Sequence, residues 1–151
     1  MAETDTHGHA SAAIQTPSPR RERLRFTDFR FRRTPDGRCT AEVELEWVDG
    51  VLLRGSSAGQ SSPTVDLRVA AEATLRAIEH FSDNVLQLEL IGVKSIRAFD
   101  ATVIVVAVDT RGEMNARLLG ASLVEADPVR GAVLAVLQAT NRVLGNVIAT
   151  R

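Results

Sequence analysis

The sequence, 151 residues long, predicts an α+β domain made of two consecutive βββα units. Residues 39–48 alternate between apolar and polar side chains, the pattern of a strand with one buried face. Two helix starts are marked by a capping residue directly before a proline, Ser62-Pro63 and Asp127-Pro128. Strand patterns precede each of these helix starts, so we expect two sheets packed with two helices.

The order of elements is duplicated. The two halves align at a shift of 65 residues, which matches Gly55 with Gly120, Ser57 with Ser122, Pro63 with Pro128 and Ala70 with Ala135. We therefore divide the chain into a disordered tail, residues 1–21, and a single domain, residues 22–151, with halves 22–83 and 84–148. The tail is small, polar and proline-dotted, so it buries too little surface to offset chain entropy.

Three strands are expected in the first half. Residues 24–32 alternate with a fault that a β-bulge near residues 27–28 would reconcile. The polar face of residues 39–48 carries three glutamates, Glu42, Glu44 and Glu46. They are natural cross-strand partners for the arginines of the preceding strand. An Asp-Gly turn at residues 49–50 then leads into a third strand at residues 51–55.

A serine-rich stretch, residues 55–63, is expected to be a flexible loop before the first helix. It lacks the Gly-Lys-Ser/Thr of a phosphate-binding loop. Ser62 is the predicted cap of a helix that runs to about Phe81. The inner stripe of this helix is Leu67, Ala71, Leu75 and Ile78. His80, near the helix end, is interpreted as a surface residue.

The second half repeats this order, with strands at residues 85–93 and 101–108. The second of these is apolar on both faces, so it should be buried on both sides. Gly120-Ala121-Ser122 is expected to be a tight turn, and Asp127 to cap the last helix. That helix is apolar nearly all round, which predicts burial on two sides and a partner subunit on the second.

Composition narrows the class of protein. The formal net charge of −1, from 18 basic and 19 acidic residues, gives no general attraction to nucleic acid or to an anionic membrane. Cys39 is the single cysteine, which favours a reducing compartment. The chain shows no signal-peptide pattern and no apolar run long enough to span a bilayer. We expect a soluble, cytoplasmic protein with no membrane contact.

No catalytic constellation is visible. The sequence offers no Ser/His/Asp, Cys/His or metal-ligand spacing, so we expect no enzyme activity, no cofactor and no metal. His7 and His9 on the tail would bind a metal weakly and unselectively. The glutamates of residues 39–48 lie on a regular outer face with no sign of a pocket, which argues against acid–base chemistry.

Two short stretches are similar to a known pattern. Residues 95–101 read Ser-Ile-Arg-Ala-Phe-Asp-Ala and precede an apolar strand. They are similar to a motif that reads Ala-Ile, two residues, Gly-x-Asp-Ala and is also followed by an apolar strand. Gly120-Ala121-Ser122, Asp127 and a helix ending in Asn141-Arg142 are similar to a glycine loop and closing helix. With residues 55–66, these resemble the C-terminal regulatory domain of α-isopropylmalate synthase, homocitrate synthase and citramalate synthase. Phe99 replaces the expected glycine, and 151 residues cannot hold the catalytic barrel.

The resemblance implies a non-catalytic regulatory or scaffold domain that forms a homodimer, binds a small amino-acid-like effector and has an enzyme as a possible partner. The expected ligand-binding residues are Asp100, Ala101, Gly120, Ala121, Ser122 and Asp127. Physically, the helix starting at Asp127 offers N–H groups to a carboxylate, and Asp100 could take an ammonium. Two alternatives stand beside this: Asp127 caps its own helix, and Gly55 and Gly120 merely allow tight turns.

An RNA-binding module is the alternative function. From residue 64 onward, the order helix, three strands, helix is that of a double-stranded-RNA-binding domain. The final helix of such a domain should begin with several lysines or arginines, and only Arg130 stands there. This argues against nucleic acid as a partner.

Overall fold

The computed structural model describes residues 24–47, 50–82, 85–112 and 115–149, and the side chains of these up to residue 144. Two βββα units follow one another, as predicted. The elements are β1 (Arg25–Arg33), β2 (Arg38–Glu46), β3 (Leu52–Gln60), α1 (Pro63–Phe81), β4 (Gln87–Ala98), β5 (Ala101–Arg111), β6 (Ala116–Val124) and α2 (Pro128–Ala149). The expected tail, with His7 and His9, lies outside the described residues.

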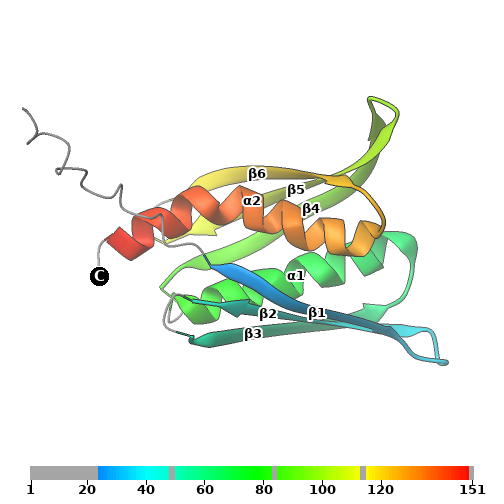
Figure 1. Ribbon diagram of the computed structural model, residues 1–151, viewed down its shortest axis with the longest axis horizontal. Helices are drawn as coiled ribbons and strands as arrows, with labels where there is room; N and C mark the ends of the chain where they lie inside the picture. Colours follow the sequence, from blue (N-terminus) through cyan, green and yellow to red (C-terminus); the bar gives the residue numbers. More distant parts are fainter. Residues whose placement is uncertain (1–23, 48–49, 83–84, 113–114, 150–151) are drawn as a thin grey trace, which may run out of the picture.

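The molecule has three layers (Figure 1). The first sheet has the strand order β1-β2-β3 and the second the order β4-β5-β6, with all neighbours antiparallel. Both helices lie between the sheets: α1 packs on β2 and β3, α2 packs on β5 and β6, and the helices contact each other. Each sheet therefore turns one face to the helices and one face outward.

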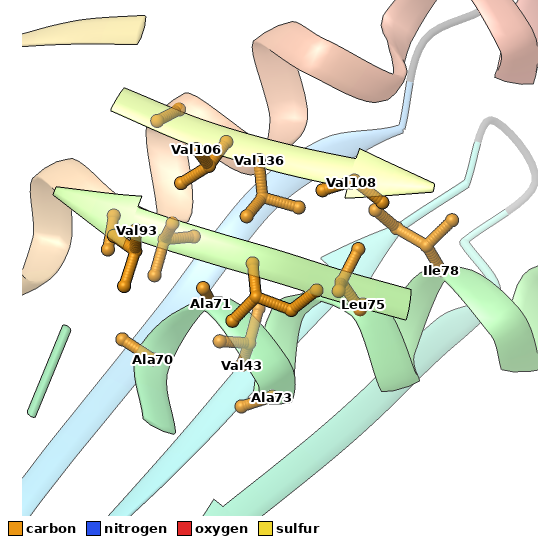
Figure 2. Packing of buried hydrophobic residues seen from close by; sticks show 14 of the residues in the cluster. Val43, Ala70, Ala71, Ala73, Leu75, Ile78, Val93, Val106, Val108 and Val136 are labelled. Atoms are coloured by element: carbon orange, nitrogen blue, oxygen red, sulfur yellow. The ribbon is translucent and has the colours of Figure 1, made fainter. Parts of the chain in front are cut away.

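A single apolar core fills the space between the sheets. The inner face of the first sheet contributes Cys39, Ala41, Val43 and Leu45, none more than 1% exposed. Figure 2 shows Val93, Val106 and Val108 of the second sheet close to Ala71, Leu75 and Ile78 of α1, with Val136 of α2 beside them. Burial of these side chains is the main force that holds the three layers together.

Local signals in the first half behave as predicted. The pairing of β1 with β2 shifts between Phe26 and Asp28, which confirms the bulge. The Ser62 hydroxyl accepts a hydrogen bond from the amide of Val65 at 3.1 Å, and Pro63 opens α1. These contacts satisfy an N–H group that would otherwise lack a partner at the helix N-terminus.

Two segments that were predicted to be irregular, a loop and a tight turn, are strands instead. The stretch from residue 55 onward, expected to be a loop, continues β3 as far as Gln60, and Gly120-Ala121-Ser122 lies in the middle of β6. Glycine suits these strands because the helices come very close: a Cβ on Gly55 would lie 2.1 Å from the Ala73 carbonyl oxygen, and one on Gly120 would lie 2.1 Å from that of Ala135. Small inward residues hid the strand pattern.

The internal duplication needs one adjustment. Gly55 and Gly120 occupy matching places, but Gly55 meets Ala73 whereas Gly120 meets Ala135. The structural counterpart of Ala135 is therefore Ala73 and not Ala70. Relative to its sheet, α1 is displaced by about one helical turn compared with α2.

The reason given for a partner subunit on α2 is also wrong. Both sides of this helix are covered within the chain, by the second sheet on one side and by α1 on the other. Val143 is 4% exposed, and among the large apolar side chains described in α2, up to residue 144, Leu134 alone is exposed, at 39%. No helix in the described part of the chain is long and apolar enough to cross a membrane.

β5 is buried on one face only. Its inward residues Ile104, Val106 and Val108 are fully buried, whereas Val103 and Val105, on the outward face, are half-buried. Among the described residues, no helix or strand lies over this outer face (Figure 1). The expectation that this strand is buried on both sides is not met by the described part of this chain.

Candidate functional site

The six residues of the expected ligand site are spread along the second unit. Asp100 lies in the two-residue turn between β4 and β5, and Ala101 begins β5. Gly120 pairs with Val106, six residues from Asp100. At about 3.3 Å per residue, roughly 20 Å separates the two along β5. A single amino acid cannot reach both.

The polar groups of Ala121 and Ser122, two of the expected ligand-binding residues, are already engaged. The amide of Ala121 donates a hydrogen bond to the Gln138 side chain at 2.7 Å, and the Ser122 hydroxyl donates to the Gly131 carbonyl at 2.6 Å. Gly120 is buried against α2. These three residues fix the strand to the helix, so their arrangement is structural in the first place.

Asp127 caps α2, as the alternative interpretation predicted. Its carboxylate accepts a hydrogen bond from the amide of Val129 at 3.0 Å, and its carbonyl accepts from Gly131 at 3.1 Å. Ligand contact at the six expected positions stays a prediction, but the glycine loop on which it was built is a strand.

A charged cleft of about 500 Å³ lies elsewhere, at the free edge and outer face of the first sheet. Its walls come from all three strands and from the last turns of α1. It contains both acidic and basic side chains, and the lining residues are Asp28, Arg30, Glu42, Val43, Glu44, Arg54, Gly55, Ser56, Arg76, Glu79 and His80. The predicted interpretation of the glutamates as a regular outer face without a pocket is therefore wrong.

Two side chains of α1 close one wall of this cleft. Arg76 donates to the carbonyl oxygen of Ser56, and Nδ1 of His80 lies 2.9 Å from the carbonyl oxygen of Arg54. Because a carbonyl oxygen only accepts, this nitrogen of His80 is the donor. These contacts occupy carbonyls that the edge strand β3 would otherwise present to another strand.

The charges in the cleft are only partly neutralised. Arg54 pairs with Glu44 at 2.9 Å, and Arg30 pairs with Asp28 at 3.0 Å. Glu42, which was expected to pair with an arginine of β1, has neither an ion pair nor a side-chain hydrogen bond to any described residue. The cleft thus holds an unused carboxylate close to several arginines.

The chemistry of the cleft suits binding. A ligand with both an ammonium and a carboxylate would find Glu42 for the first and the guanidinium groups for the second. Within the described ranges, no group of three or more His, Cys, Asp or Glu side chains could hold a metal ion. The cleft was missed because it depends on the position of α1 beside β3, and the only sequence signal is the spacing of Arg76 and His80, one turn apart.

A second polar cluster ties the end of β1 to the start of α1. Asp66, 4% exposed, accepts hydrogen bonds from Arg33 at 2.7 Å and from the Ser61 hydroxyl at 2.8 Å. Burial raises the pKa of Asp66, but hydrogen bonds from Arg33, Ser61 and Cys39 outweigh it and hold this pKa below the ordinary value. Burial, together with Asp66, raises the pKa of the Cys39 thiol. The cluster is therefore a structural tie with an inert, protonated cysteine.

Comparisons with protein-family models and with curated proteins find no match for this chain. The resemblance to the regulatory domain of α-isopropylmalate synthase therefore stays a prediction from short motifs.

Proposed function

We propose that the protein is a non-catalytic regulatory or scaffold domain that binds a small zwitterionic effector of amino-acid type in the charged cleft. The observation that carries the proposal is Glu42, which has no ion-pair partner among the described residues and lies in a cleft of about 500 Å³ that also holds three arginines. A cavity of this size is in the usual range for small-molecule sites. It is larger than a single amino acid needs, so water fills the remainder.

The proposed pose follows from the hydrogen bonds already made. Glu42 accepts the ligand ammonium. Arg76 uses only part of its guanidinium on the Ser56 carbonyl, so its remaining N–H groups are available to the ligand carboxylate. Arg54, 75% exposed at its side chain, can turn from Glu44 to assist.

The test is a thermal-shift screen followed by titration calorimetry. We expect one or more L-amino acids to raise the melting temperature of the protein. Two analogues of each active amino acid, one without the carboxylate and one without the amino group, should have no effect. At a concentration 100 times its Kd, a ligand stabilises by about 2.7 kcal/mol, which is roughly 5–11 °C for a domain of this size.

Variants locate the binding site. Glu42→Gln should weaken binding by about tenfold to a hundredfold, the range for losing a hydrogen bond to a charged group. Glu46→Gln, a change of the same kind on the same strand but outside the cleft, is the control and should bind normally. Equal binding by wild type and Glu42→Gln, or no response to any amino acid, would contradict the proposal.

Assembly and location belong to the same proposal. We infer a homodimer in the cytoplasm, with an enzyme as a candidate partner for regulation. The buried, free thiol of Cys39 supports a reducing compartment. Light scattering at micromolar concentration tests the dimer, because a monomer and a dimer differ twofold in mass.

RNA binding is the second candidate. The observation in its favour is the arrangement α1-β4-β5-β6-α2, in which both helices pack against one face of a three-stranded antiparallel sheet. Against it, Arg130, the single basic residue at the start of α2, lies 4.7 Å over the Phe26 ring and so is engaged within the chain. A filter-binding titration with a 20-base-pair RNA duplex would decide; we expect no saturable binding at 150 mM salt.

A further inference from the structure

The two sheets differ sharply in their outer faces. The outward side chains of the first sheet are mostly charged, including Arg30, Glu42, Glu44 and Arg54. The outer face of the second sheet is largely apolar at its centre, where the register brings together Ile96, Val103, Val105, Leu119, Ala121 and Leu123, with the exposed Lys94 beside Val105. Three of these are strongly exposed: Leu119 at 70%, Leu123 at 58% and Ile96 at 43%.

This apolar face continues into a strained turn. Phe99, at the tip of the β4–β5 hairpin, has a φ of 54° and is 97% exposed. A positive φ is unusual for a bulky side chain, and exposure of the ring to water adds a second penalty. Figure 1 shows this hairpin projecting beyond the rest of the molecule. A strained and fully exposed ring beside exposed leucines indicates a surface that is buried in an assembly.

We infer that the outer face of the second sheet binds the same face of a second copy of this chain. The inference identifies the interface of the homodimer that the proposed function includes. β5 supports it directly, because its outward residues have the apolar composition of a strand that is buried on both faces. Two such faces pack as in a β-sandwich, with strands aligned within about 30° and sheets about 10 Å apart.

The charges at one end of the face are complementary to themselves. Register places Glu89, Asp109 and Arg117 in one row across β4, β5 and β6. A two-fold axis parallel to β5 lays β4 of one copy over β6 of the other, so Glu89, which also pairs with Arg111 of its own chain, meets Arg117 of the second copy, and the reverse. Asp109 lies near the axis, opposite Asp109 of the second copy, and its charge is offset by the pair with Arg117 of its own chain at 2.8 Å.

The same axis pairs most of the apolar residues with one another, and it lays Lys94, whose long apolar stem can extend to the rim of the contact, over Ala121 of the second copy. Ile96 comes over Leu123 of the second copy, and Val105 over Val105. Three strands and about seven residues cover roughly 330 Å² in projection, and the Phe99 tips and the charged row enlarge the contact. This is below the roughly 800 Å² per partner of a standard interface, so we expect a reversible dimer that dissociates on dilution.

The experiment is sedimentation velocity on the full chain across about 1 to 200 µM. We expect the wild type to shift from monomer to dimer over this range, and Leu119→Arg to stay monomeric throughout, because each dimer would bury two unpaired charges. Leu52→Arg is the matched control, since Leu52 is 50% exposed on the outer face of the first sheet and should dimerise like wild type. Circular dichroism checks that both variants are folded.

Two further variants test the geometry. Glu89→Arg alone should weaken the dimer, and Glu89→Arg with Arg117→Glu should restore it. Phe99→Asn should weaken the dimer while it raises the melting temperature of the monomer, because it relieves the strained turn. A Phe99 with a purely local role would leave the dimer affinity unchanged.

Each outcome is decisive. A wild type that is monomeric at 200 µM, or a Leu119→Arg variant that dimerises like wild type, overturns the inference. Ligand binding in the cleft is measured separately, so a monomer that still binds an amino acid removes the dimer and leaves the effector site. A dimer that persists in Leu119→Arg keeps the homodimer and removes this face as its interface.

Discussion

Replacing Gly120 with alanine tests how closely β6 approaches α2. A Cβ at this position would lie 2.1 Å from the Ala135 carbonyl oxygen, 2.7 Å from the Ala139 Cβ and 2.8 Å from the Ala139 amide nitrogen. Two of these three atoms are backbone of α2, which cannot move aside as a flexible side chain would. The methyl group can be accommodated only if the helix withdraws from the sheet.

The size of the effect follows from these distances. Non-bonded heavy atoms are most comfortable near 3.5 Å, so α2 would have to move by more than about 1 Å. Moving α2 disturbs its contacts with β5 and α1 as well as with β6. Overpacking of a core costs about 1–3 kcal/mol and at times more, and we expect about 3 kcal/mol or more here, a fall in melting temperature of roughly 6–12 °C.

The assay is chemical denaturation followed by circular dichroism, with two companion variants. Gly55→Ala should lose a similar amount, because its Cβ would lie 2.1 Å from the Ala73 carbonyl oxygen. Gly92→Ala is the control: this strand glycine has nothing within 4 Å of an added Cβ, so the change should be neutral or stabilise by up to about 1 kcal/mol. All three changes add the same methyl group to a strand, so only the surroundings differ.

One result would refute the reasoning. If Gly120→Ala and Gly92→Ala had the same stability, β6 and α2 would not be in close contact. Gly120 would then be a turn glycine of the kind the sequence suggested, and the loop interpretation of the ligand site would return.

Two further predictions concern the buried polar and apolar residues. Asp66→Asn should cost about 1–3 kcal/mol at pH 7. The folded-state pKa of Asp66 is depressed. Its contribution to stability is therefore fully present above the unfolded pKa of about 3.9 and is lost as the pH falls through the folded pKa. Urea unfolding should show a smaller difference in stability between wild type and Asp66→Asn at pH 3 than at pH 7. Val143→Glu should prevent folding because it buries an unpaired charge. Leu134→Glu, at a side chain 39% exposed, should change the stability by less than about 1 kcal/mol. Equal melting temperatures for the two variants would contradict the observed packing of α2.

The elements that were predicted well are those with local signals. Alternation revealed β2, and the cap and proline at Ser62-Pro63 revealed the start of α1, because one chain segment carries the whole pattern. Small inward residues hid part of β3: Gly55, Ser57 and Gly59 face α1, and their composition is also typical of a loop. A glycine required for a turn and one required for close packing look alike until the distance to the helix is known.

The candidate site could not be predicted for a similar reason. Glu42 and Glu44 were visible as a charged face, but the cleft exists only because Arg76 and His80 reach across the edge of β3. These two contacts join residues that are 20 and 26 positions apart in the chain. Local patterns carry no information on such a pairing, whereas the burial of each strand face depends mainly on its own alternation.

The divergence of the two units is the strongest guide to function. Both units share the same element order and a glycine at the same place in the last strand, so packing against the helices imposes similar inner faces. The outer faces are free of that constraint, and they have become opposite: charged with a cleft on the first sheet, apolar on the second. Solubility alone would favour two charged faces, because exposed leucines such as Leu119 and Leu123 favour association. The apolar face therefore points to association and the charged face to a ligand, and these two roles can be separated by single substitutions on opposite sides of the molecule.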